Sequence, residues 1–185
     1  MASPLGGLRA SADQIVLRRP DLAGLPPTVV PDGYALRRFL PGDEAAWADL
    51  LGRAFPETPD ARTLPAREFM AGPLWDPQRI VFACADGRPV ACAAAWENAA
   101  QWGPRTGMIH WVATDPDHVR RGLGRATVVA ALEWMRGRYD DAVLVTQVYR
   151  LPAIRLYLAL GFRPHLDAIP EMPERWKRVE RGLRG

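Results

Sequence analysis

One stretch, residues 108–138, constrains the possible folds more than any other part of the chain. Residues 108–114 are mostly apolar, aromatic or β-branched and predict a strand, which residues 115–117 (Asp-Pro-Asp) interrupt. Apolar residues then recur with helical spacing over residues 123–135. The stretch therefore predicts a strand, a polar turn and an amphipathic helix in direct succession.

Two glycines stand where the expected helix begins. Gly122 and Gly124 fall where unpaired backbone N–H groups and the positive end of the helix dipole favour an anion, and glycine lets an anion approach closely. Three arginines surround the same turn: Arg120, Arg121 and Arg125. The expected ligand of this turn is a phosphate or a pyrophosphate.

A glycine pair after a strand also opens dinucleotide-binding folds, but the third position of that fingerprint is Thr127 here. The sequence also contains no G-x-x-x-x-G-K-[ST] loop. A second segment, residues 151–162 (L-P-A-I-R-L-Y-L-A-L-G-F), follows a predicted strand at residues 141–148. The residue patterns of both segments together therefore indicate which kind of ligand the glycine turn binds.

Together the two segments resemble the GNAT superfamily of acyl-CoA-dependent N-acyltransferases. The first is similar to the family's coenzyme A pyrophosphate motif, [RQ]-x-x-G-x-[GA], and the second to its A-[IV]-x-[LF]-Y-x-x-x-G-F helix. Two positions depart from the family: Val119 stands where Arg or Gln is usual, and Arg150 where Asn is usual. Backbone N–H groups do most of the pyrophosphate binding, so these departures read as variation within the family.

The resemblance implies an α/β (α+β) fold. It is the GNAT fold, a central, mostly antiparallel mixed sheet of six to seven strands flanked by about four helices and splayed between the two central strands. We expect a Pro/Gly-rich extension at residues 1–33 with a short edge strand at 15–17, a GNAT acetyltransferase domain at 34–170, and a charged tail at 171–185.

Within that domain the residue patterns predict the elements one by one. A strand at 34–39 precedes a helix capped by Asp43, with an apolar face of Trp47, Leu50, Leu51 and Ala54. The other expected elements are a helix at 64–71, a hairpin of 80–85 and 90–98, a loop at 101–105, a helix at 152–160 ending at Gly161, and a strand at 162–166.

The resemblance also implies acetyl-CoA as co-substrate and no metal. The coenzyme-binding residues it suggests lie at the strand end, in the glycine turn and on the motif helix: Val112, Ala113, Thr114, Val119, Arg120, Arg121, Gly122, Leu123, Gly124, Arg125, Ala126, Arg150, Ala153 and Tyr157.

Tyr157 matches the family's tyrosine near the coenzyme sulfur, which protonates the leaving thiolate. Ordinary pKa values of ~10 for tyrosine and ~8.5 for a thiol put the two groups within reach of proton exchange. A core tyrosine on an amphipathic helix is the alternative. The developing oxyanion should meet a backbone N–H group of the strand at residues 108–114.

Two residues and a water chain are alternative candidates for the general base. His110 shares a strand face with Met108, Val112 and Thr114 if the strand alternates regularly, and a structural histidine is the alternative. Glu97 ends the preceding strand, where a carboxylate is often simply solvated. Trp75, Trp96 and Trp102 either line the acceptor pocket or pack in the core.

Composition excludes several other classes. A net charge of +3 with scattered arginines, despite a pI near 9.2, makes nucleic-acid binding a distant third candidate. No apolar run is long enough for a membrane span and no signal segment is recognisable, so a cytoplasmic monomer or homodimer is expected. Cys84 and Cys92 should be free thiols, without metal-site spacing.

The function expected from both motifs is N-acetyl transfer from acetyl-CoA to a primary amine of a small molecule or protein, by direct attack in a ternary complex. A non-catalytic acyl-CoA-binding sensor on the same fold is the alternative, favoured if His110 and Glu97 both face away from the cleft.

Overall fold

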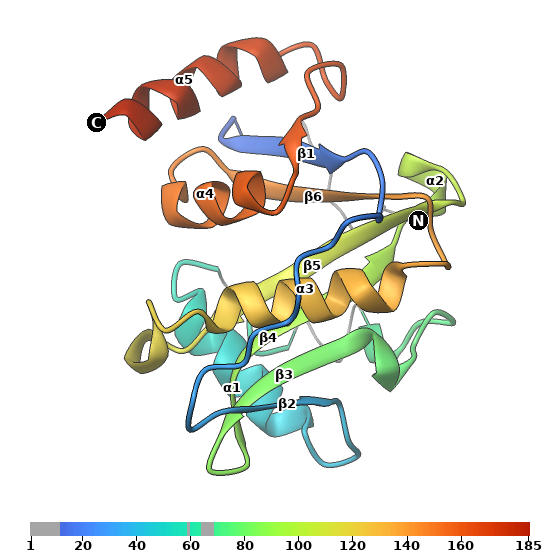
Figure 1. Ribbon diagram of the computed structural model, residues 1–185, viewed down its shortest axis with the longest axis vertical. Coiled ribbons are helices and arrows are strands. Elements are labelled where there is room, and N and C mark those ends of the chain that lie inside the picture. The colour runs from blue at the N-terminus through green and yellow to red at the C-terminus, as the bar shows by residue number, and fades with distance from the viewer. Residues whose placement is uncertain (1–11, 59, 64–68) are drawn as a thin grey trace. The chain divides into compact units, whose positions relative to one another are not determined.

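The computed structural model describes residues 12–58, 60–63 and 69–185 (Figure 1). The chain divides into two compact units, each built from segments that are separate in sequence. The first unit consists of Met1–Ala23, Glu97–Met108 and Gly137–Gly185, and the second of Gly24–Trp96 and Ile109–Arg136.

Three successive antiparallel strands run through the second unit: β2 (Ala35–Arg38), β3 (Ile80–Ala85) and β4 (Arg88–Glu97). The hairpin of β3 and β4 was expected. Its two turn residues, Asp86 (φ 49°) and Gly87 (φ 78°), both adopt positive φ, as the turns that match strand twist require. A one-turn 3-10 helix, η2 (Pro77–Arg79), leads into β3.

The predicted strand, turn and helix are confirmed as β5 (Thr106–Thr114), the 3-10 turn η3 (Pro116–His118) and α3 (Leu123–Met135). Helix α3 packs on β3, because Leu123 joins a buried cluster with Ala83, Val90 and Ala91. This packing holds the first residue of the helix, and with it the glycine turn, against the strands.

Helix α1 (Glu44–Ala54) buries Trp47, Leu50 and Leu51, as its apolar spacing predicts, and leaves Ala54 half-buried. The expected side-chain cap by Asp43 is wrong. Its carboxylate instead accepts two hydrogen bonds from Arg37, at 2.5 and 2.8 Å, and one from the backbone N–H of Leu40 at 2.7 Å. A paired guanidinium binds a carboxylate more strongly than a backbone amide does, so the ion pair wins.

In the first unit, β1 (Gln14–Arg19) lies between β6 (Asp141–Gln147) and the short β7 (Arg163–Pro164), antiparallel to both. The expectation of an edge strand at residues 15–17 is therefore wrong. Ile15, Val16 and Leu17 are completely buried, because β6 pairs along the whole strand, β7 pairs with Leu17 and Arg18, and helix α5 (Met172–Arg184) packs on β1.

The remaining helices also belong to the first unit: α2 (Ala99–Trp102), α4 (Leu151–Ala159) and α5 (Met172–Arg184). Helix α2 occupies part of the loop expected at residues 101–105. Helix α5 forms in the segment expected as a charged tail, and it packs on β1 and α4 through buried residues that include Met172 and Val179.

The described residues therefore form seven strands and five α-helices, an α/β fold. The expected strand number is confirmed, and two of the five helices, α2 and α5, were not among those expected. The helix expected at 64–71 lies mostly outside the described residues. Cys84 and Cys92 are both free, as predicted, because they do not face each other: Cys92 pairs with Phe82 and Cys84 with Pro89.

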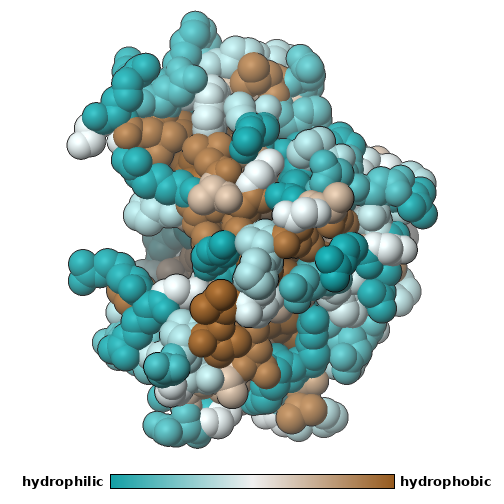
Figure 2. Space-filling view, viewed as in Figure 1, coloured by the Kyte–Doolittle hydropathy of each residue, from teal (hydrophilic) through white to brown (hydrophobic). Residues whose placement is uncertain are grey.

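The surface combines hydrophilic and apolar residues, and the face shown in Figure 2 has apolar residues reaching the solvent between charged ones. Exposed large apolar side chains include Val29, Val119 and Tyr149. Among the described residues, no helix has both the length and the apolar character needed to cross a membrane.

Candidate active site

The glycine turn has the backbone geometry of an anion site. Arg120 (φ 60°) and Gly122 (φ 83°) both adopt positive φ, so the chain turns sharply into α3. The first hydrogen bond of the helix runs from the Ala126 N–H to the Gly122 carbonyl at 3.0 Å. The N–H groups of the preceding helical residues have no partner within the helix, and Gly122 at the N-cap has no side chain to cap them. These donors fit a phosphate oxygen.

A tyrosine from the segment before β2 reaches the same turn. The Tyr34 hydroxyl lies 2.9 Å from His118 Nδ1, and Arg121 Nη1 donates to that hydroxyl at 2.9 Å. Pro31 also borders the turn, since a Cβ added to Gly122 would lie 3.7 Å from Pro31 Cγ. The turn is therefore supported by residues about 90 positions earlier in the chain.

Asp115 closes β5 and begins the turn. Its N–H donates to the Val90 carbonyl at 2.8 Å, and its carboxylate accepts from the Asp117 N–H at 3.0 Å and from Arg53 at 2.8 Å. Burial by itself would raise the pKa of this carboxyl, but the bonds from Asp117 and Arg53 outweigh burial and the pKa is lowered. Asp115 is therefore a buried carboxylate that stays charged.

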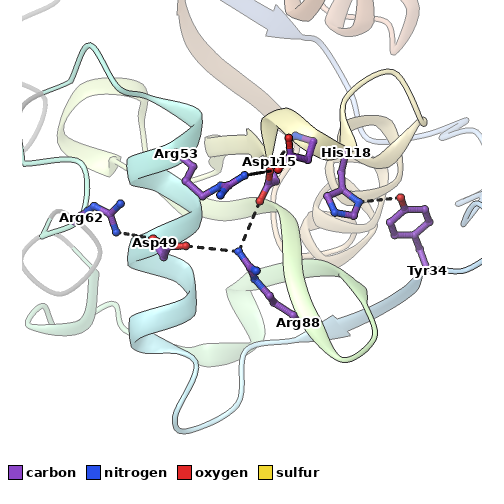
Figure 3. Close-up of polar contacts among 8 residues, drawn as sticks. Tyr34, Asp49, Arg53, Arg62, Arg88, Asp115 and His118 are labelled. Atoms are coloured by element: carbon purple, nitrogen blue, oxygen red, sulfur yellow. Dashed lines mark hydrogen bonds and ion pairs between the residues drawn. The ribbon is translucent and has the colours of Figure 1, made fainter.

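A line of alternating charges extends from Asp115 along α1 (Figure 3). Arg53 also bonds Asp117 at 2.7 Å, and Arg88, at the hairpin turn, lies 3.8 Å from Asp115 and 3.6 Å from Asp49. These ion pairs connect α1, the β3–β4 hairpin and the start of the turn. The ion pairs of Asp115 lie where β5 ends and the turn begins.

Strand β5 is not regular at the position that decides where His110 points. Trp111 adopts φ 45°, which is strained for an aromatic residue, and its carbonyl accepts a hydrogen bond from Cys92 Sγ at 3.2 Å. The regular alternation that would give His110 a common face with Val112 and Thr114 is interrupted there. A local irregularity of this kind turns side chains to a new direction.

His110 is half-buried among aromatic rings. Its ring centroid lies 5.1 Å from Trp111, nearly stacked, and 5.5 Å from Phe69. Burial lowers the pKa of His110 to about 4, because the charged imidazolium loses water without gaining an opposite charge. The imidazole is therefore neutral at pH 7.

Two of the three singled-out tryptophans belong to this aromatic core of the second unit. Trp96 lies 4.3 Å from Phe69 between ring centroids, and Trp75 stacks on Trp47 at 6.5 Å. Trp102, in the first unit, faces His165 at 6.4 Å. Core packing thus accounts for Trp75 and Trp96, and further ring contacts extend the cluster through Phe39 and Phe82.

The motif helix of the first unit is α4. Ala153 and Tyr157 stand four residues apart and therefore share a face, and Arg150 precedes the helix. Tyr157 is buried and packs edge-on against Phe162 at 6.0 Å. Burial raises the pKa of its hydroxyl to about 12, and the nearby charge of Arg150 partly opposes that rise. The phenol is fully protonated at neutral pH.

The remaining candidate base, Glu97, is the last residue of β4 and is half-buried. It falls in the first unit with α4, whereas His110 falls in the second with the glycine turn. Among the strand residues expected at the coenzyme, Ala113 is buried and Val112 and Thr114 are half-buried.

The family model for the acetyltransferase (GNAT) family matches residues 45–162, more than half of the chain. The chain belongs to the GNAT family. The mycothiol acetyltransferase of Thermomonospora curvata is 36% identical over 164 residues, covering 85% of this chain and 54% of the relative. The mycothiol acetyltransferase of Kineococcus radiotolerans is 37% identical over 148 residues, covering 76% of this chain and 47% of the relative.

A GCN5-related N-acetyltransferase from Sphaerobacter thermophilus has a similar structure, with a TM-score of 0.63 and 25% identity. It aligns over 82% of this chain and 48% of its own. This GNAT chain thus spans about half the length of the curated relatives that it matches.

Sequence reasoning about this GNAT chain missed Tyr34, His118, Asp115 and Arg53 as parts of the turn. No motif spacing connects positions 34 and 118, or 53 and 115, and only the fold brings them together. The one available signal was the aspartate directly before Pro116, a residue pair typical of turns. In the described part of the chain, no group of three or more His, Cys, Asp or Glu residues could hold a metal ion.

Proposed function

We propose that this chain transfers an acetyl group from acetyl-CoA to a primary amine by direct attack within a ternary complex. The observation that carries the proposal is the uncapped start of α3 beside Gly122 in a chain of the GNAT family. Three residues of the turn carry positive charge, which suits a pyrophosphate. The thioester supplies the activated acetyl group.

The coenzyme would be held first by backbone N–H groups at residues 122–126. Arg121, fixed by Tyr34, adds charge at the same turn. The expected oxyanion donors are backbone N–H groups of β5 near Val112 and Ala113. The positive φ at Trp111 supports this assignment, because an irregular strand residue reorients the backbone groups next to it.

Tyr157 would donate a hydrogen bond to the departing sulfur. With a pKa of about 12, its proton is about 3.5 pKa units less acidic than an ordinary thiol at ~8.5, so complete transfer would cost about 5 kcal/mol. Burial disfavours a thiolate in the same way as a phenolate. The hydroxyl therefore contributes as a donor that strengthens while negative charge develops on the sulfur.

The low pKa of His110 makes this residue a poor candidate for the general base. A group with a pKa of about 4 is roughly six units less basic than an alkylamine at ~10.4, and efficient bases titrate near the working pH. We therefore propose that His110 packs in the aromatic core and that Glu97 or a water chain takes the proton from the amine.

The acceptor is inferred from the names of the relatives. The relatives are named for mycothiol acetylation, which favours a small-molecule amine over a protein amine, and the acceptor of that reaction is the first to test. A cytoplasmic location stays part of the proposal. So does a monomeric or homodimeric state, which light scattering of the purified chain tests.

Calorimetry with coenzyme A tests the binding site. We expect Gly124→Val to abolish measurable binding, because a β-branched side chain at the turn blocks the close approach of pyrophosphate. The control is Gly185→Val, where an added Cβ meets nothing within 4 Å. Unchanged binding by Gly124→Val would contradict the coenzyme site.

Activity is tested by thiol release from acetyl-CoA with a panel of small amines that includes the mycothiol acceptor. Turnover with at least one amine is expected. Binding of coenzyme A without turnover on any amine or protein acceptor would favour the acyl-CoA-binding sensor instead.

A further inference from the structure

Tyr34 is anchored on the core that also supports the glycine turn. Its ring is half-buried and packs against the cluster of Ala83, Val90, Ala91 and Leu123, and Leu123 is the first residue of α3. Its ring also meets that of His118 edge-on, with centroids 5.8 Å apart. The phenol is therefore held against the base of the turn rather than reaching it from a flexible loop.

Two side chains form hydrogen bonds with the Tyr34 hydroxyl. Arg121 can only donate, so the hydroxyl oxygen accepts from Arg121 Nη1 at 2.9 Å. The same hydroxyl forms a hydrogen bond with His118 Nδ1, also at 2.9 Å, and the imidazole tautomer sets which of the two groups donates. The Tyr34 hydroxyl therefore connects Arg121 to His118 through two hydrogen bonds.

This chain of bonds uses little of the guanidinium. Arg121 is exposed and its guanidinium has five N–H donors, of which the contact with Tyr34 occupies one. The remaining N–H donors belong to a residue that immediately precedes Gly122 in the glycine turn. Fixing a long side chain before its ligand arrives lowers the entropy that binding removes.

We propose that Tyr34 is a positioning residue of the coenzyme site: its hydroxyl, oriented by His118, directs the Arg121 guanidinium toward an anionic group of coenzyme A. The inference rests on the proposed function of the turn as the coenzyme site. It adds to that site a residue from the segment before β2, far outside the glycine motif in sequence.

The test is calorimetry with coenzyme A on Tyr34→Phe, which removes the hydroxyl and keeps the ring on the core. A hydrogen bond of ordinary strength predicts a Kd raised about fivefold. Tyr139→Phe is the matched control, since it removes a tyrosine hydroxyl in the first unit, and it should bind as the unchanged chain does. Thermal melts check that each variant is folded.

A double-variant cycle separates positioning from packing. If Tyr34 acts through Arg121, then Tyr34→Phe weakens binding in the original chain but adds nothing in the Arg121→Ala background. An equal factor in both backgrounds, or wild-type binding by Tyr34→Phe, would overturn the proposal. His118→Phe, which removes the second hydrogen-bond partner of the hydroxyl and keeps a ring, should give a smaller loss of affinity and replaces Tyr34→Phe if that variant fails to fold.

The two proposals fail in distinguishable ways. Wild-type binding by Gly124→Val would overturn the coenzyme site itself. Loss of binding by Gly124→Val, together with wild-type binding by Tyr34→Phe, would overturn only the positioning role.

Discussion

Arg19 donates a hydrogen bond to the carbonyl oxygen of Leu160, where α4 ends. A second bond from its guanidinium, at 2.6 Å, reaches the Ala23 carbonyl. The buried β1 strand thus holds the C-terminus of the helix that carries Tyr157. Gly161 follows directly with φ 87°, and an added Cβ there would overlap the Arg19 guanidinium.

Gly161→Ala should destabilise the fold for two reasons, backbone strain at positive φ and displacement of Arg19. We expect a loss of about 1–3 kcal/mol in the free energy of unfolding, measured by urea denaturation. Gly87→Ala is the matched control, because Gly87 has φ 78° but open space around its Cβ position. Equal losses in the two variants would show that the contact with Arg19 contributes nothing.

Asp115→Asn should destabilise the turn, because the amide keeps the bond from the Asp117 N–H but loses the charge that binds Arg53. We expect about 1–3 kcal/mol by urea denaturation. Asp49→Asn, whose ion pairs are solvent-exposed, should cost about 0.5 kcal/mol. Comparable losses from both variants would contradict a special role for the buried carboxylate.

Asp115→Asn should also change the pH dependence of the free energy of unfolding. The folded-state pKa of Asp115 is lowered, so its stabilising effect is present above the unfolded value of ~3.9 and disappears as pH falls through the folded value. The free energy of unfolding of Asp115→Asn should therefore fall less steeply below about pH 4 than that of the unchanged chain.

Tyr157→Phe should lower kcat about 10- to 100-fold while acetyl-CoA affinity changes less than about twofold, because its hydroxyl acts mainly as charge develops on the sulfur. Steady-state kinetics and calorimetry measure the two quantities. A parallel loss in both would assign Tyr157 to packing, in keeping with its contact with Phe162. Unchanged turnover would leave water as the proton donor.

His110→Gln tests the structural role of the imidazole. Its pKa of about 4 in the fold lies below ~6.5 in the unfolded chain, so the unfolded state binds the proton first. Stability from neutral His110 is complete above about pH 6.5 and declines toward pH 4, by about 3 kcal/mol at most. The variant should lack this decline in urea denaturation measured across that range.

The acid limb of kcat/KM gives the second readout for His110. A structural histidine leaves the limb in place in His110→Gln, and the base is then Glu97 or water. Loss of the limb together with a large drop in rate would restore His110 as the base, with its titration near pH 4 rather than near 6.5.

The sequence by itself determined the elements whose causes are local. The change from β-branched residues to a Pro-containing turn and then to helical spacing predicted β5, η3 and α3, because strand and helix periods depend on neighbouring residues. Asp86 and Gly87 specified the hairpin turn in the same way, and the two glycine motifs identified the family before any geometry was known.

Tertiary structure decided everything that depends on partners distant in sequence. The segment of β1 is flanked by prolines and glycines, and its sequence predicted only an edge strand. Its interior position arises from pairing with β6, more than 120 residues later. The Asp43 carboxylate pairs with Arg37 and does not cap its own helix. The pKa of His110 is lowered by burial among aromatic rings that surround it only in the fold. Burial and charge pairing are properties of the folded surroundings, so no local pattern encodes the Tyr34, His118 and Arg121 contacts.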